Sequence, residues 1–217
     1  MIDFSYAPML LKGAAVTLIS WAIAGTLSLV IGITLGIISC NYLNFSITQK
    51  LVRAYTFVTK GIPAYVQILT AYFVIPSLLN INISGFAAAT CALAFCSSGY
   101  VTEIIRSGIN AVPKGQWDAC SVLGYPLKST LSRIIIPQTI VLVLPTLLGE
   151  LEQLLKSTSL LATIGVIELT RAGMNIVSRE LNPLPVYAII ACVYLLFSAI
   201  LQTLVAYAQK RINYGSR

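Results

Sequence analysis

The sequence predicts one all-α, polytopic membrane domain over residues 1–217, and three observations support this prediction. Hydrophobic residues make up 57% of the 217 residues and charged residues only 10%, whereas soluble domains average about 25% charged residues. The mean hydropathy is +0.86. Uncharged runs reach 37 residues at 13–49 and 42 residues at 61–102. One membrane crossing needs about 20 apolar residues, so the chain can cross several times.

Five spans are expected from the uncharged runs. The first run is too long for the apolar part of a signal peptide, so it is expected to stay as a span. The second run is long enough for two spans, and the Pro, Asn, Ser and Gly residues between Pro76 and Gly85 predict a turn that divides it. The remaining runs supply one span each. The predicted spans are 14–38, 57–76, 84–103, 134–155 and 186–207.

Two of these spans carry residues that affect helix packing. In the first, Ser28, Gly32 and Gly36 recur every four residues, so they line one helix face and let another backbone approach closely. That neighbour is either another helix of this chain or a second copy or homologous subunit. In the fourth, Pro137 and Pro145 each remove a backbone donor and can bend the helix.

The distribution of Lys and Arg predicts the orientation. The segments after the first, third and fifth spans lie on one side of the membrane and hold 10 of the 14 basic residues, against two acidic residues, Glu103 and Asp118. The other side holds four basic and five acidic residues. Because cytoplasmic loops carry the excess of Lys and Arg, the N-terminus is expected outside and the C-terminus inside. The net charge of +7 is therefore read as a topology signal, and binding of nucleic acid is not expected.

The chemistry available to the chain is narrow. It has no histidine, which removes Ser–His and Cys–His nucleophile pairs and imidazole acid–base catalysis. It also has no G-x-x-x-x-G-K-[ST] loop to hold ATP phosphates. No enzymatic activity, no metal and no cofactor bound by this chain are expected. The cysteines lack metal-ligand spacing and are read as free thiols; they are Cys40, Cys91, Cys96, Cys120 and Cys192.

The segment 112–133 predicts a helix–glycine–helix unit between the third and fourth spans. A helix is expected to start at Pro113 and to stop at Gly124, which Pro126 follows, and a second short helix at 127–133 leads into the fourth span. Gly124 allows a sharp reversal and presents no side chain, so another protein's surface can approach. The alternative interpretation is a solvated amphipathic loop.

Motifs in this segment and elsewhere resemble the permeases of ABC importers. Asp118-Ala119-Cys120-x3-Gly124-x9-Ile134-x-Ile136-Pro137 is similar to their E-A-A-x3-G-x9-I-x-L-P loop. Three further segments, 13–18, 60–67 and 154–160, are similar to G-T-x-x-T-L, R-G-T-P-L-L-V-Q and L-L-K-D-T-S-L of the polar amino acid subgroup. The chain differs from these motifs at several positions. It has Asp118 in place of Glu, Cys120 in place of Ala, Lys60 in place of Arg, Ile62 in place of Thr and Ser157 in place of Asp. The other motif positions are Gly61, Pro63, Gln67, Pro137, Lys156, Thr158 and Ser159.

The resemblance implies a function and a set of partners. It implies a permease subunit in the bacterial inner membrane that moves a polar amino acid into the cytoplasm. The energy would come from two separate ATPase subunits, which use ATP and Mg, and the solute from an extracytoplasmic solute-binding protein. A second permease chain, identical or paralogous, would complete the pore. The residues implied to couple the chain to the ATPases are Trp117, Asp118, Ala119, Cys120, Gly124 and Pro126.

Charged residues near the spans give the candidates for substrate and surface contacts. Glu150 and Glu152 are about 200° apart on a helix, so they cannot face one pocket. Glu152 has Lys156 as an i,i+4 partner, whereas Glu150 has no obvious partner and is hypothesised to attract a substrate ammonium or guanidinium from the pathway.

The other charges have more ordinary interpretations. Glu103 and Arg106 are expected to pair. The outer charges are expected to be solvated surface or to touch the solute-binding protein; they are Glu168, Arg171, Arg179 and Glu180.

One other function stays open at this point. An ATP-independent channel or secondary carrier for a small polar solute would also be apolar and helical. The sequence shows neither an internal repeat nor a proton relay to support it. The energy source distinguishes the two, and the amino acid transported is not determined.

Overall fold

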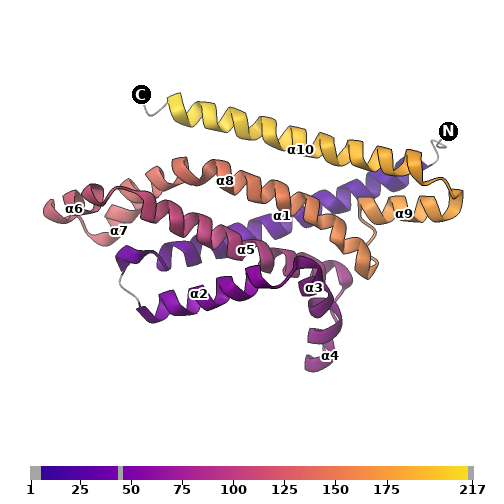
Figure 1. Cartoon of the computed structure of the whole chain (residues 1–217), viewed down its shortest axis with the longest axis horizontal. Coiled ribbons are helices and arrows are strands. Elements are labelled where there is room, and N and C mark those ends of the chain that lie inside the picture. Colours follow the sequence, from indigo (N-terminus) through magenta and orange to yellow (C-terminus); the bar gives the residue numbers. More distant parts are fainter. Residues whose placement is uncertain (1–5, 44–45, 215–217) are drawn as a thin grey trace.

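The computed structural model describes residues 6–43 and 46–214, and the described chain is helical with short connections (Figure 1). Asp3 and Arg217, which were counted in predicting the orientation, and the two ends of the predicted domain 1–217 lie outside the described residues. The α-helices are α1 (Ala7–Ile38), α2 (Ser46–Gly61), α3 (Ala64–Leu69), α4 (Ile75–Leu79), α5 (Gly85–Ala111), α6 (Lys114–Val122), α7 (Leu127–Thr130), α8 (Ile136–Ser157), α9 (Leu169–Glu180) and α10 (Pro183–Tyr214).

Helices α1 and α5 pack against each other at the centre of the molecule (Figure 1). A Cβ added at Gly32 would lie 2.5 Å from Val101, and one added at Gly36 would lie 2.7 Å from Ile105. Ser28, in the same row, is completely buried. The sequence allowed two kinds of neighbour for this face, a helix of this chain or one of another subunit. The structure places a helix of the same chain there.

The predicted span 57–76 is wrong as one helix. The chain breaks at Ile62–Pro63, and the segments Ser46–Gly61 and Ala64–Leu79 meet at 97°. Proline lacks an amide donor and disfavours a helical residue before it. The Gln67 side chain donates hydrogen bonds of 2.7 Å to the carbonyls of Thr59 and Ile62, so it satisfies acceptors that the break leaves open. A π-helical turn, η3 (Thr70–Val74), joins α3 to α4.

Helices occupy the other four predicted spans, and each extends beyond the predicted limits at one end or both. The fourth runs from Leu127 to Ile164, because α7 continues through a π-helical turn, η4 (Leu131–Ile135), into α8 and the 3₁₀ helix η5 (Thr158–Ile164). Pro137 follows that π turn and Pro145 lies inside α8. Within residues 6–43 and 46–214, four helices are long and apolar enough to cross a membrane, and the bent pair would make five.

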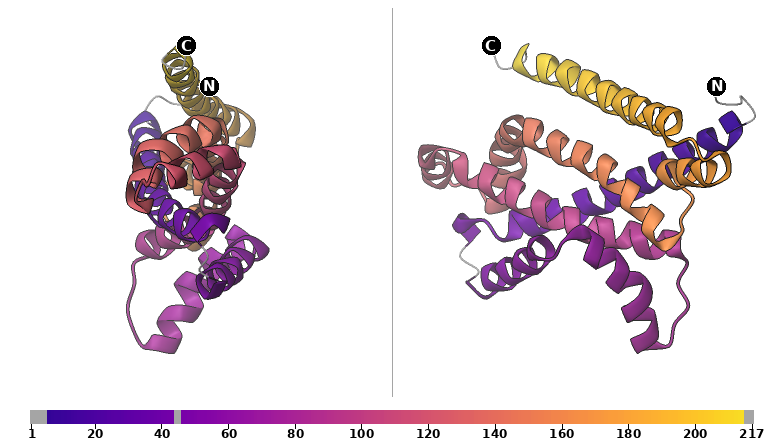
Figure 2. Two further views of the ribbon diagram at one scale, coloured as in Figure 1. Left: turned by 90° about the vertical axis from the view of Figure 1, so that its left-hand side faces the viewer. Right: turned by 45° about the vertical axis from the view of Figure 1, so that its right-hand side comes forward.

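The connecting elements gather at two ends of the molecule. Figure 1 shows α6 and the C-terminal end of α10 at one end, and α9 with the start of α1 at the other. Figure 2 shows the same separation and shows that α4 projects away from the other helices. A helix–glycine–helix unit thus caps one end of the bundle, and a short surface helix caps the opposite end.

Candidate functional site

Glu150 lies in a pocket between α8, α5 and the α2–α3 bend. The pocket has a volume of about 270 Å³ and is lined by side chains that include Lys60, Cys96, Ser97 and Tyr100. The Ser97 hydroxyl donates a 2.7 Å hydrogen bond to the Glu150 carboxylate. Among the described residues, Glu150 forms no ion pair. A carboxylate held only by a hydroxyl keeps most of its capacity to accept hydrogen bonds from a cation.

Glu152 lies on the opposite side of α8, as the helical spacing predicts. Its carboxylate accepts hydrogen bonds from Lys156 at 2.8 Å and from Gln202 of α10 at 3.1 Å, so the predicted i,i+4 pair is confirmed. It lines a different cavity, of about 160 Å³, between α8 and α10. The charge of Glu152 is therefore matched within the chain, whereas that of Glu150 is not.

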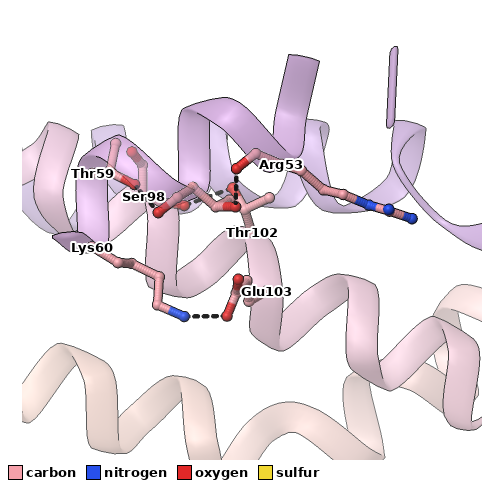
Figure 3. Close-up of polar contacts among 7 residues, drawn as sticks. Arg53, Thr59, Lys60, Ser98, Thr102 and Glu103 are labelled. Carbon is pink, nitrogen blue, oxygen red and sulfur yellow. Dashed lines mark hydrogen bonds and ion pairs between the residues drawn. The ribbon is translucent and has the colours of Figure 1, made fainter. Parts of the chain in front are cut away.

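The ion-pair partner of Glu103 was predicted wrongly from the sequence. Glu103 forms an ion pair with Lys60 of α2, not with Arg106 (Figure 3). The ammonium of Lys60 also lies 5.4 Å from the centre of the Tyr100 ring. The end of α2 can come this close because Thr59 fits over Gly99, where α5 has no side chain. Because Glu103 neutralises Lys60, the charge of Glu150 remains the unmatched one in the pocket.

The motif positions around the site hold helix ends in place. Thr158 and Ser159 donate side-chain hydrogen bonds of 2.7 and 2.8 Å to carbonyls at the end of α8. Gln67 is buried and its amide holds the α2–α3 bend. Gly61 and Pro63 are exposed at that bend. Of these residues Pro63 lines the pocket, and the others hold the helix ends beside it.

The predicted coupling residues divide between the two sides of α6. The Trp117 ring is buried and stacks on Tyr42, with ring centres 4.2 Å apart, and Cys120 is also buried. Asp118 and Ala119 are exposed. A partner could therefore reach Asp118 and Ala119, while Trp117 and Cys120 anchor α6 to the rest of the chain.

The reversal after α6 exposes an apolar surface that the sequence analysis did not name. Gly124 has a φ of +71°, in the left-handed region, and nothing lies within 4 Å of an added Cβ. Just before it, Val122 and Leu123 are 86% and 73% exposed. Pro126 is exposed and is the N-cap residue of α7. The turn thus presents two apolar side chains next to a residue without one.

Glu168 was expected at the surface, and the structure places it in the interior instead. Its side chain is completely buried and caps α9 by accepting 2.8 Å hydrogen bonds from the amides of Thr170 and Arg171. The Tyr194 hydroxyl of α10 donates a third, at 3.1 Å. Burial raises the pKa of Glu168, and these hydrogen bonds oppose the rise. Glutamate is not among the preferred capping residues, so this role had little signal in the sequence.

The remaining outer charges lie nearer the surface. Arg179 and Glu180 are exposed, and Arg171 is half-buried. Glu180 accepts a hydrogen bond from the Tyr6 hydroxyl at the start of α1. Together with Glu168, this contact ties α9 to α1 and α10.

Comparison with known proteins gives a consistent family. Residues 28–214 match the family of binding-protein-dependent transport system inner membrane components. The arginine transport system permease protein ArtQ of Bacillus subtilis (strain 168) is 32% identical over 204 residues, 92% of each chain. A putative glutamine transport system permease protein GlnP of Rickettsia prowazekii (strain Madrid E) is 36% identical over 83% of each chain.

Solved structures resemble the chain over almost its whole length. The crystal structure of an amino acid ABC transporter with histidines superposes with a TM-score of 0.87 at 31% identity, covering 97% of this chain and 99% of the other. An inward-facing structure of the MetNI methionine ABC transporter has a TM-score of 0.85 at 14% identity, covering 97% and 99%. At that identity the second comparison bears on the fold alone.

Proposed function

The chain belongs to the family of binding-protein-dependent transport system inner membrane components and is the permease subunit of an amino acid ABC importer, and from this premise we propose that Glu150 selects its substrate by charge. The family moves solute with energy from separate ATPase subunits, so an ATP-independent channel or carrier is not favoured. The chain supplies the membrane path, and the ATP chemistry belongs to its partners.

The partners follow from the family, and their arrangement is part of the proposal. Two ATPase subunits, which use ATP and Mg, would dock on the exposed side of α6 and the turn at Gly124. A second permease chain, identical or paralogous, would complete the path, and a solute-binding protein would approach the end that carries α9. The N-terminus would lie outside and the C-terminus in the cytoplasm, in agreement with the excess of Lys and Arg near α6.

Glu150 supports a preference for substrates with a positively charged group. A charge within a membrane span is costly unless it lines a cavity or meets a partner. Glu150 lines the pocket, and the Ser97 hydroxyl is its hydrogen-bond partner among the described residues. A substrate ammonium or guanidinium would supply the missing countercharge. This unmatched carboxylate is the single observation on which the proposed selectivity rests.

The test compares two equivalent substitutions on one helix. Glu150→Gln removes the unmatched charge, and Glu152→Gln removes a charge that Lys156 and Gln202 already hold. In proteoliposomes that contain the ATPases and the binding protein, labelled Arg, His, Gln and Glu would be supplied in turn. We expect Glu150→Gln to lower the uptake of arginine relative to glutamine at least tenfold, and Glu152→Gln to leave that ratio unchanged. An unchanged ratio in Glu150→Gln would contradict the proposal.

A further inference from the structure

Helix α2 has two faces of opposite character. One face packs on α5, with the side chains of Val52, Thr56 and Thr59 buried between the helices. The other face carries large apolar side chains that the described chain does not cover. These side chains are Ile47, Leu51 and Phe57, which are 74%, 66% and 80% exposed.

The uncovered face of α2 also carries unmatched positive charge. Lys50 lies within it and Arg53 at its edge, one helical turn further on, and both are exposed. Neither forms an ion pair among residues 6–43 and 46–214, and α2 contains no acidic residue. Figure 3 shows the Arg53 side chain extending away from the Lys60–Glu103 pair. The occupant of this face must therefore combine apolar surface with negative charge.

A second copy of the chain could offer little negative charge. Of the acidic residues within the described ranges, Glu103 and Glu152 are in ion pairs. Glu168 is buried, and Glu150 lies in the pocket. Glu180 accepts a hydrogen bond from Tyr6. Asp118 alone among them is exposed and unmatched, and it lies on α6. The charges therefore favour a different kind of occupant.

We propose that the exposed face of α2 binds an anionic phospholipid of the cytoplasmic leaflet. Lys50 and Arg53 hold the phosphate, and the acyl chains lie along Ile47, Leu51 and Phe57. Long basic side chains on an apolar surface reach toward the headgroups in this way. The cytoplasmic placement rests on the proposed orientation, and the inference goes beyond the transport function itself.

Spin-labelled lipids test this proposal directly. The full-length chain, with any subunits that purify with it, would be placed in phosphatidylcholine bilayers containing traces of labelled phosphatidylglycerol or labelled phosphatidylcholine. Electron spin resonance then gives the fraction of each lipid held by the protein. We expect a preference for phosphatidylglycerol that falls about fivefold for each of Lys50→Gln and Arg53→Gln. Lys50→Arg with Arg53→Lys should keep the preference.

A matched control removes the same charge elsewhere. Lys128 and Arg133 are exposed at the same end of the molecule but are not one turn apart, so the pair Lys128→Gln and Arg133→Gln should keep most of the preference. Equal loss in this pair and in Lys50→Gln combined with Arg53→Gln would overturn the proposal, because it would show an unspecific charge effect. Cross-linking of a cysteine at position 53 to another permease chain or to an ATPase, in a cysteine-free background, would also overturn it. Melting temperatures confirm that each variant is folded.

Discussion

At the scale of the residue, Gly124 shows how one backbone angle sets a surface. Its φ of +71° is costly for residues with a Cβ, least so for Asn and Asp. Because nothing in the described part of the chain lies within 4 Å of an added Cβ, a substitution there perturbs this chain itself only through its backbone. Gly124→Val should therefore reshape the turn and lower uptake per ATP hydrolysed several-fold, whereas Gly124→Asn should retain most of it. Both rates would be measured on one preparation of the reconstituted importer, and equal coupling in the two variants would contradict this.

Glu168 gives a second prediction at this scale. The backbone amides of Thr170 and Arg171 and the Tyr194 hydroxyl all donate hydrogen bonds to its carboxylate. The side-chain NH2 group of a glutamine is itself a donor, so it could not accept these hydrogen bonds. Glu168→Gln should destabilise the protein by about 1–3 kcal/mol, the usual cost of unsatisfied buried groups. The measurement is the melting temperature of the purified chain at neutral pH. An unchanged melting temperature would mean that the site holds a neutral acid.

Ion pairs could be predicted from the sequence only where the two residues lie close together along the chain. Glu152 and Lys156 are four positions apart, so helical geometry alone brings them together. Glu103 meets Lys60, which is 43 positions away, and only the packing of α2 on Gly99 makes that pair possible. The burial of Glu168 likewise depends on α1 and α10. Sequence spacing carries no information on such distant neighbours.

At the scale of the element, the packing of α1 on α5 depends on the absence of side chains. Gly32→Leu would place a Cβ 2.5 Å from Val101, and overpacking of this kind costs about 1–3 kcal/mol. We expect a clear fall in melting temperature in detergent. Gly149→Ala is the control, because Gly149 is an exposed helical glycine with nothing within 4 Å of its added Cβ; its stability should stay the same or rise. Equal melting temperatures of the two variants would contradict this packing.

The two sides of α6 should respond differently to substitution. Trp117→Ala removes a buried ring that stacks on Tyr42, and the loss should be about 3–5 kcal/mol of stability. Leu123→Asp changes a side chain that is 73% exposed, so stability should hold while uptake per ATP hydrolysed falls. Thermal melts and coupled transport assays on both variants test this. Full coupling in Leu123→Asp would show that the ATPases dock elsewhere.

The elements themselves were predictable to different degrees. The composition of a long uncharged run such as 181–209 is enough to predict a helix. The end of α6 before Gly124 was predicted correctly from Gly124 and the Pro126 that follows it. The bend at Ile62–Pro63 was not predicted, because hydropathy measures how apolar a segment is and not whether the helix axis changes direction within it. Pro63 was visible in the sequence, but a 97° break depends on Gln67 holding the carbonyls at the bend.

At the scale of the whole molecule, the orientation makes a direct prediction. In a cysteine-free background, single cysteines at exposed positions 115 and 181 lie at opposite ends of the molecule, the first within α6 and the second directly after α9. A thiol reagent that cannot cross the membrane should label position 181 in intact cells and position 115 only after the cells are opened. The reverse pattern would place α6 outside and would separate it from any cytoplasmic ATPase.

The central claim is that this chain forms the path of the solute through the membrane and that separate ATPase subunits supply the energy. The most direct measurement is uptake of labelled amino acid by two sets of proteoliposomes, one with the permease alone and one with its ATPases and binding protein. We expect uptake against a concentration gradient only in the complete set and only with ATP on the side of α6. Equal accumulation by the permease alone, without ATP, would contradict the account.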